Sequence, residues 1–197
     1  MKVNIKNTKN TMDINLQVKH KNKTRELTKV ACMAALICVA SFVYIPLPFT
    51  EARISLMPFM VELVGLILSP VQAGVSILVY LIIGILGLPV FAGVGGLGKI
   101  LGPSGGYYWG FVPAAVAVSL CKGKKYNCVR YILVCIFVGI TIMYVPGAIQ
   151  MKHQLHLPWM AVLIKSVFPF IALDIVKAVA AGIIAKPIQA ALHNMEE

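Results

Sequence analysis

Acidic side chains are scarce in this 197-residue chain, with 7 Asp and Glu against 18 Lys and Arg, for a formal net charge of +11. Charged residues of any kind make up only 13% of the sequence, and 59% of the residues are hydrophobic. That composition is typical of an integral membrane protein. The lysines gather in a tail and one loop without the aromatic interleaving that stacks bases, so the positive charge predicts no nucleic-acid partner.

Cysteine and histidine patterns typical of metal or disulfide chemistry are also lacking. The five cysteines are odd in number, never form a C-x-x-C pair and lie in apolar runs or in a basic loop. They predict neither a disulfide framework nor a zinc site. His153 and His156 could share a helix face, but with no carboxylate or thiolate beside them they indicate solvated side chains rather than metal ligands. We therefore expect no metal and no cofactor.

Long runs with few or no charges predict an all-α integral membrane protein, a compact bundle of six transmembrane helices. About 20 apolar residues are enough to cross a hydrocarbon core about 30 Å thick. Residues 1–27 are polar and basic and predict a disordered tail, whereas residues 28–197 predict the membrane domain. The expected spans lie at about residues 30–50, 54–69, 71–88, 105–121, 131–151 and 165–185.

The basic residues orient this bundle. If the N-terminal tail is cytoplasmic, six crossings place 13 of the 18 Lys and Arg residues inside, because the loop after the fourth span and the C-terminus are then inside too. Four basic residues lie outside and Lys177 lies within the membrane. This asymmetry follows the positive-inside rule and predicts a plasma-membrane protein with both termini cytoplasmic.

The stretch Gly87 to Gly110, GLPVFAGVGGLGKILGPSGGYYWG, lies between the third and fourth expected spans. Its glycines predict a loop, and an apolar loop beside membrane spans is expected to fold over a ligand pocket on the extracellular face. The segment GVGGLGK imitates the core of a phosphate-binding loop, but Ile100 stands where a Ser or Thr must hold magnesium. Gly102 then ends any helix that could present its N-terminus to phosphate, so we expect no nucleotide site.

Three charged residues lie inside expected spans, away from the ends of those spans. Asp174 and Lys177 are three residues apart and so lie on one helix face, where they could bind a ligand or satisfy each other as an ion pair. Ala178, Ala181 and Ala185 continue that face as a stripe of small residues that turns the aspartate inward. Glu62 lies near the middle of the second expected span and is either a pocket residue or a structural partner for a donor.

The loop LGLPVFAGVGGLGKILGPSGGYYWGF and the later segment PFIALDIVKA resemble the BioY family, the biotin-specific substrate-binding subunits of energy-coupling-factor transporters. The resemblance implies a six-helix bundle in which the loop after the third span closes an outward-facing pocket. It also implies that Asp174 and Lys177 bind biotin, which offers two ureido N–H donors, a carbonyl and a carboxylate. The full set of expected ligand-binding residues is Asp174, Lys177, Val94, Gly95, Gly96, Gly98, Tyr107 and Glu62.

The same resemblance implies partners, namely a transmembrane coupling protein and two cytoplasmic ATPases. Ala31 and Ala35 form a small-x-x-x-small pair that either packs within this bundle or contacts the coupling protein. Competing interpretations are a subunit for another vitamin or a biotin precursor, a membrane enzyme that uses Glu62, Asp174 and His153 on a lipid, and a purely structural subunit. Membrane enzymes usually cluster several such residues and none cluster here, so we expect no catalytic residues.

Overall fold

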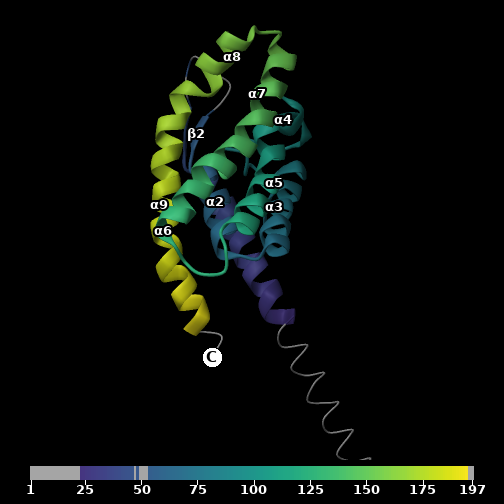
Figure 1. Ribbon diagram of the computed structural model, residues 1–197. Helices are drawn as coiled ribbons and strands as arrows, with labels where there is room; N and C mark the ends of the chain where they lie inside the picture. Colours follow the sequence, from purple (N-terminus) through teal and green to yellow (C-terminus); the bar gives the residue numbers. More distant parts are fainter. Residues whose placement is uncertain (1–22, 47, 49–52, 195–197) are drawn as a thin grey trace, which may run out of the picture.

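The computed structural model describes residues 23–46, 48 and 53–194, and these form an elongated bundle of helices with one short β-hairpin (Figure 1). The prediction of a mainly helical fold is therefore confirmed. A first helix covers residues 23–40. The later elements are β1 (Tyr44–Pro46), β2 (Arg53–Ser55), α2 (Met57–Ile67), α3 (Pro70–Ile85), α4 (Leu97–Leu101), α5 (Gly105–Cys121), α6 (Cys128–Val134), the π-helical turn η1 (Cys135–Ile140), α7 (Thr141–Leu155), α8 (Trp159–Ser166) and α9 (Phe168–Asn194).

The first expected span, residues 30–50, is helical only as far as residue 40. The chain then enters strand β1, which pairs antiparallel with β2 and sets Tyr44 opposite Ser55 and Pro46 opposite Arg53. Hydropathy cannot distinguish an apolar helix from an apolar strand, and Pro46 cannot continue a helix. Toward the N-terminus, residues 23–27 are helical although they belong to the tail that was expected to be disordered, and residues 1–22 of that tail lie outside the described part of the chain.

Two helical segments, Cys128–Leu155 and Phe168–Leu192, are each long and apolar enough to cross a membrane. The first runs without interruption through α6, η1 and α7, and the second is most of α9. The remaining apolar helices are shorter, as in α2 and α3. The α9 helix continues to Asn194 although Pro187 lies within it, nine residues beyond the end expected from the charge pattern. A bundle of six full spans thus remains a prediction.

A close contact between α5 and α7 fixes the centre of the bundle. Gly106 of α5 lies against the backbone of α7, and a Cβ atom added at Gly106 would lie 2.1 Å from the carbonyl oxygen of Pro146. A Cβ added at Gly110, one turn later, would lie 3.0 Å from the backbone of Met143. Only glycine allows two helix backbones to approach this closely. The contact brings Tyr107 of α5 beside Tyr144 of α7.

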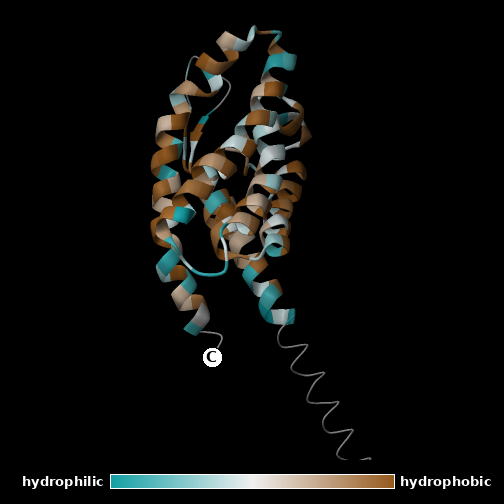
Figure 2. Ribbon diagram, viewed as in Figure 1, coloured by the Kyte–Doolittle hydropathy of each residue, from teal (hydrophilic) through white to brown (hydrophobic). Residues whose placement is uncertain are grey.

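The two ends of the bundle differ in polarity (Figure 2). One end carries α4, α8 and the β-hairpin, and the other carries the hydrophilic loop between α5 and α6 together with the outer ends of α9 and of the helix at residues 23–40 (Figure 1). At this second end, the last carbonyl groups of α2 accept hydrogen bonds from polar side chains of other helices. Ser119 and Lys122 donate to Leu68, and Gln189 of α9 donates to Leu66. These bonds satisfy helix-end carbonyls that have no partner within the helix.

Candidate functional site

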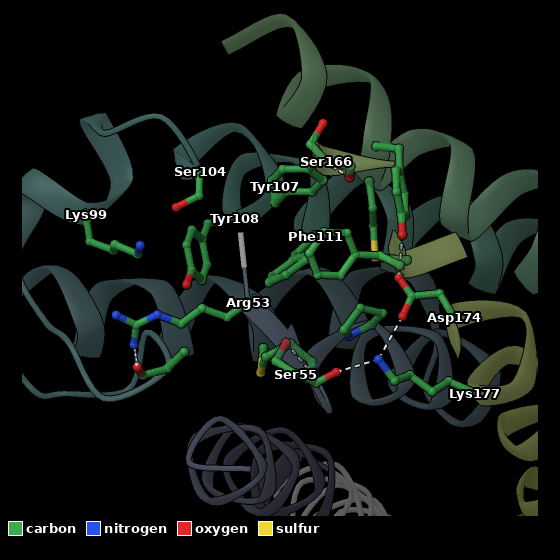
Figure 3. A pocket seen from close by; sticks show the side chains of 16 residues that line it. Arg53, Ser55, Lys99, Ser104, Tyr107, Tyr108, Phe111, Ser166, Asp174 and Lys177 are labelled. Atoms are coloured by element: carbon green, nitrogen blue, oxygen red, sulfur yellow. Dashed lines mark hydrogen bonds and ion pairs between the residues drawn. The ribbon is translucent and has the colours of Figure 1, made fainter. Parts of the chain in front are cut away.

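A pocket lies between the β-hairpin, α4, α5, α7 and α9, at the end of the bundle that carries α8 (Figure 3). Its wall is aromatic and aliphatic in the middle and polar at both ends, as in many sites for small amphipathic ligands. The lining residues are Arg53, Ser55, Met57, Pro58, Ala92, Lys99, Ser104, Tyr107, Tyr108, Phe111, Met143, Tyr144, Ser166, Phe170, Asp174 and Lys177.

One polar end is a connected network around Asp174, whose side chain is almost fully buried. Its Oδ1 pairs with Lys177 Nζ at 2.7 Å, and its Oδ2 accepts a hydrogen bond from the Tyr144 hydroxyl at 2.7 Å. Lys177 Nζ also donates to the carbonyl oxygen of Ser55 at 2.7 Å. The ion pair suggested by the three-residue spacing is therefore present. The network ties α9 to α7 and to the β-hairpin, and it faces the pocket.

This network keeps free hydrogen-bonding capacity. Each carboxylate oxygen can accept two hydrogen bonds and Asp174 uses one at each oxygen, whereas Lys177 has three N–H donors and uses two. A ligand that offers N–H donors and a carbonyl acceptor side by side can therefore bind here without breaking the ion pair. Ala178, Ala181 and Ala185 continue the same face of α9 and are fully buried. The stripe of small residues thus packs inward as the sequence indicated.

The other polar end carries positive charge. Figure 3 shows Arg53, Lys99 and Ser104 at the side of the pocket away from Asp174 and Lys177. Arg53 donates to the carbonyl oxygen of Ala92 and lies over the ring of Tyr44, 5.1 Å from its centroid. The hydroxyl of Ser104 is buried and has no hydrogen-bond partner among the described residues. Buried hydroxyls are normally satisfied, so this one is available to a ligand.

The two polar ends of the pocket differ in the charged side chains that line them. Among the described residues that line the pocket, Asp174 is the one carboxylate, whereas Arg53, Lys99 and Lys177 are all cationic. Lys177 is paired with Asp174, and the other two cations of the lining, Arg53 and Lys99, lie at the opposite end. The pocket therefore suits an elongated ligand with an anionic group at one end and a neutral polar group at the other.

Aromatic rings form the wall between these two ends. Tyr107 and Tyr144 meet edge to face with ring centroids 5.7 Å apart, and the Tyr107 hydroxyl donates to the carbonyl oxygen of Ser166 at 2.8 Å. Tyr108 and Phe111 form a second edge-to-face pair at 5.5 Å. Figure 3 shows Tyr107 and Phe111 between the two polar ends. Such a wall can cover the apolar part of a ligand.

The glycine-rich loop closes one side of the pocket through a few residues. Ala92 and Lys99 line the pocket, whereas the expected contacts Val94, Gly95, Gly96 and Gly98 are not among its lining residues. Phe91 anchors the loop, because its buried ring packs on Tyr80 and Tyr108 and leaves room on α3 only for Gly84. The side chains before and after the central glycines therefore reach the pocket while the glycines themselves shape the turn.

The glycine content had predicted an irregular loop. The structure differs, because this segment contains the five-residue helix α4. Gln150 of α7 holds the end of this helix by donating to the carbonyl oxygens of Ile100 at 3.0 Å and Gly102 at 2.8 Å. Lys99 lies inside this short helix, which ends at Leu101, and Ile100 follows it where a phosphate-binding loop has a Ser or Thr.

Glu62 is fully buried but does not line the pocket. Neither of its carboxyl oxygens has a hydrogen-bond partner among the described residues. It faces Gly139 of η1, where an added Cβ atom would lie 3.4 Å from Glu62 Oε1. A buried carboxyl group without a hydrogen-bond partner is costly, so Glu62 does not act as the hydrogen-bonded partner of a donor among the described residues.

Several polar lining residues were absent from the expected site, although the sequence contained a weak signal for some of them. Arg53 is an isolated cation between apolar residues, and Tyr144 is a phenol within an apolar helix, where its hydroxyl needs a partner. Ser104 and Ser55 carried no signal. Ser55 takes part through its backbone carbonyl, which any residue type could supply.

The predicted partner surface and the cysteines lie away from the pocket. Ala31 and Ala35 are both exposed on the helix at residues 23–40, whereas Ala34 is buried. All five cysteines are free, and the described residues contain no group of three or more His, Cys, Asp or Glu side chains that could hold a metal. His153 and His156 are exposed.

Comparisons with known proteins agree over most of the chain. A family model described as the BioY family matches residues 9–194. A probable biotin transporter BioY of Pyrococcus horikoshii is 39% identical over 171 residues, which cover 85% of this chain and 98% of the relative. The biotin transporter BioY of Thermotoga maritima is 33% identical over 165 residues, which cover 82% and 94%. The crystal structure of the S-component for biotin from an ECF-type ABC transporter matches with a TM-score of 0.81 and 28% identity, covering 86% of this chain and 93% of that one.

Proposed function

This chain belongs to the BioY family, and from that membership we propose that its pocket binds biotin in the substrate-binding subunit of an energy-coupling-factor transporter. Its function is biotin uptake, and the family is a transporter component rather than an enzyme. The observation that carries the assignment of the pocket is its pair of unlike polar ends, joined by an aromatic wall.

Biotin matches these ends in a defined orientation. Its ureido group presents two N–H donors and a carbonyl acceptor, which suit the spare acceptor sites of Asp174 and the spare donor of Lys177. Its carboxylate then lies at the cationic end, beside Arg53 and Lys99 and within reach of the unpartnered Ser104 hydroxyl. Charge-assisted hydrogen bonds to the carboxylate at that end would contribute a large part of the binding free energy.

A chemical comparison tests this orientation. Biotin methyl ester keeps the ureido group but lacks the charge, so the parent protein in detergent should bind it more weakly than biotin. Arg53→Gln should weaken biotin roughly tenfold or more and leave the affinity for the ester nearly unchanged. Asp174→Asn should weaken both ligands. Equal losses for both ligands in Arg53→Gln would contradict the orientation, and unchanged biotin affinity in Asp174→Asn would contradict the site.

A biotin precursor or another vitamin is the alternative ligand. Dethiobiotin shares the ureido group and the carboxylate but lacks the sulfur ring that the aromatic wall would cover. Titration with both compounds, together with mass spectrometry of any small molecule that copurifies, separates these possibilities. Tighter binding of dethiobiotin than of biotin would make the precursor the preferred ligand.

The proposed topology has six membrane crossings, both termini in the cytoplasm and the pocket open to the outside of the plasma membrane. The positions of the helices and the excess of basic residues at the end opposite the pocket support it. In this arrangement the glycine-rich segment around α4 is the extracellular lid, and Ala92 and Lys99 are its contacts with the pocket.

The proposed partners are a transmembrane coupling protein and two cytoplasmic ATPases, which would supply the energy for uptake. The exposed Ala31 and Ala35 support a docking surface on the helix at residues 23–40, because small side chains let a partner helix approach closely.

A further inference from the structure

The corner between α4 and α5 carries one of the polar groups of the pocket. Residues 102–105, with the sequence Gly-Pro-Ser-Gly, form a turn that the Gly105 N–H closes on the carbonyl oxygen of Gly102 at 2.9 Å. Ser104 has φ −92° and ψ 4°, as the third residue of a type I turn does, and proline is favoured at the second position. This turn therefore determines where the buried, unpartnered Ser104 hydroxyl lies on the pocket wall.

Gln150 of α7 holds this turn from outside the pocket. The NH₂ group of its side chain has two N–H donors, and they reach the carbonyl oxygens of Ile100 at 3.0 Å and Gly102 at 2.8 Å. The Gly102 carbonyl is the group that closes the turn, so it accepts one hydrogen bond from within the turn and one from Gln150. Gln150 is not among the lining residues, so it can act on a ligand only through this corner.

The packing around Gly105 shows how closely this corner fits α7. A Cβ atom added at Gly105 would overlap the carbonyl oxygen of Ile100 and would lie 2.6 Å from Gln150 Nε2. Gln154, one turn further along α7, donates to the carbonyl oxygen of Leu101. Two side chains of α7 thus hold the carbonyl groups of three successive residues at the end of α4. These carbonyls lie where a helix leaves its own acceptors without partners.

The effect of this clamp is confined to one end of the pocket. Figure 3 shows Ser104 on the side of Arg53, away from Asp174. The hydrogen bonds of Asp174 are made with Tyr144 and Lys177 and do not involve Gln150. A hydrogen bond weakens steeply when its donor is misaligned, and a donor that is already fixed costs less entropy to engage. Gln150 therefore matters for a ligand group that accepts from Ser104 and not for one held by Asp174.

We propose that Gln150 is a positioning residue for the carboxylate end of the biotin site. It fixes the turn at residues 102–105 so that the Ser104 hydroxyl donates to the ligand carboxylate, and it does so without touching the ligand. The inference rests on the proposed biotin function. It adds that a residue outside the pocket sets how strongly the site prefers biotin, an anion, over a neutral derivative of biotin.

The test replaces the amide of Gln150 and compares two ligands. Gln150→Met keeps a side chain of similar length without N–H donors, and biotin and biotin methyl ester are titrated against the protein in detergent. Biotin should bind roughly tenfold more weakly, whereas the affinity for the ester should change less than about twofold. A merely structural role would weaken both ligands alike. An equal loss for both ligands in Gln150→Met overturns the proposal.

Gln189→Met is the matched control. The side-chain amide of Gln189 also makes two hydrogen bonds, to the carbonyl oxygen of Leu66 at 2.7 Å and to the Tyr131 hydroxyl at 3.1 Å, and it lies outside the pocket. This variant should change the affinity for either ligand less than about twofold. A selective loss of biotin binding in Gln189→Met as large as in Gln150→Met overturns the proposal, because the effect would then not depend on the corner.

A double-mutant cycle tests whether Gln150 acts through Ser104. Ser104→Ala should itself weaken biotin, and Gln150→Met in that background should cost less than about threefold more, because the hydroxyl that it positions is gone. A further tenfold loss overturns the proposal. If Gln150→Met does not yield folded protein, Gln150→Asn takes its place in every comparison, since it keeps the amide but shortens its reach by one methylene group. It should show the same selective loss, and the same outcomes overturn the proposal.

Asp174→Asn separates this inference from the function on which it rests. If Asp174→Asn leaves biotin affinity unchanged, the biotin site itself is wrong and the role of Gln150 falls with it. If Asp174→Asn weakens both ligands while Gln150→Met behaves like Gln189→Met, the biotin site stands and the positioning role alone is overturned.

Discussion

The hydroxyl of Tyr144 donates a hydrogen bond of 2.7 Å to Asp174 Oδ2, which links α7 to α9 inside the bundle. Lys177 holds the other carboxyl oxygen, so the carboxylate of Asp174 is clamped between two donors from two helices. A clamped carboxylate can receive a ligand without first losing side-chain freedom. In the proposed biotin site, Tyr144 would therefore act by orienting Asp174 as well as by lining the pocket.

Tyr144→Phe removes this hydroxyl and keeps the ring. We expect biotin affinity to fall roughly tenfold, since hydrogen bonds to charged groups contribute about 1.5 to 3 kcal/mol and Asp174 would retain only Lys177. Isothermal titration calorimetry in detergent measures the loss. Tyr126→Phe is the matched control, because it removes a hydroxyl that donates to the carbonyl oxygen of Gly182 outside the pocket. A similar loss in both variants would mean a general effect on the bundle.

Asp174 and Lys177 should behave as one unit. Asp174→Asn or Lys177→Ala removes a ligand contact and also leaves the other charge buried without its partner, so each should weaken biotin roughly tenfold to a hundredfold. The double variant should cost less than the sum of the two, because neighbours in one charged network are coupled. A double-mutant cycle on biotin affinity measures this coupling. Additive losses would show that the two residues contact biotin independently.

The sequence indicated the Asp174 end of the pocket more readily than the Arg53 end. Charges within an apolar helix are costly, so the sequence indicated a role for Asp174 and Lys177. Their three-residue spacing also predicted that they lie on one face of α9. Arg53 reaches the pocket because Tyr44–Pro46 and Arg53–Ser55 form a hairpin, and hydropathy assigned most of that region to helical spans. A hairpin depends on pairing between two segments, which no single apolar run reveals.

The glycine-rich loop between α3 and α5 illustrates a second limit of prediction from the sequence. Its glycine content predicted a loop from Gly87 to Gly110, whereas Leu97–Leu101 and the residues from Gly105 onward are helical. The glycine content also could not show which residues would face the ligand. That choice depends on Phe91, whose ring fits against Gly84, and on Gln150, which holds the end of α4 from a distant helix. Such contacts between separate parts of the chain determine whether a neighbouring side chain such as Lys99 points into the pocket.

The exposed alanines on the helix at residues 23–40 lead to a prediction about uptake. Ala35→Trp places a bulky ring where a partner helix would approach, so biotin binding should be retained while ATP-dependent uptake in reconstituted vesicles is lost. Leu36→Trp is the matched control, since Leu36 is also exposed on the same helix but faces another direction. Loss of biotin binding in Ala35→Trp would mean that Ala35 serves packing within the bundle.

The proposed topology predicts which positions an impermeant thiol reagent can reach. In a variant without the five native cysteines, Lys152→Cys should react from outside intact cells and Lys124→Cys should not. Permeabilised cells should show labelling at both positions, which establishes that each variant is present and reactive. The reverse pattern would place the biotin pocket on the cytoplasmic side.

Glu62 gives the last prediction, because its buried carboxyl group lies outside the pocket and has no described hydrogen-bond partner. Replacing an unsatisfied buried polar group by an apolar one of similar size is often neutral or stabilising. Glu62→Leu should therefore keep or raise the melting temperature, by about 2–4 °C for each kcal/mol gained, and change biotin affinity by less than about twofold. Thermal denaturation and biotin titration measure the two effects.

Glu62→Gln serves as the companion variant, since it keeps the shape of the side chain and fixes it in a neutral form. If Glu62 is a neutral acid in the folded protein, Glu62→Gln should match the parent in both measurements. A tenfold loss of biotin affinity in Glu62→Leu with an unchanged melting temperature would instead support the ligand-binding role expected from the sequence. In that case the bound protein would have to move α2 or η1, because Glu62 faces Gly139 and does not line the pocket.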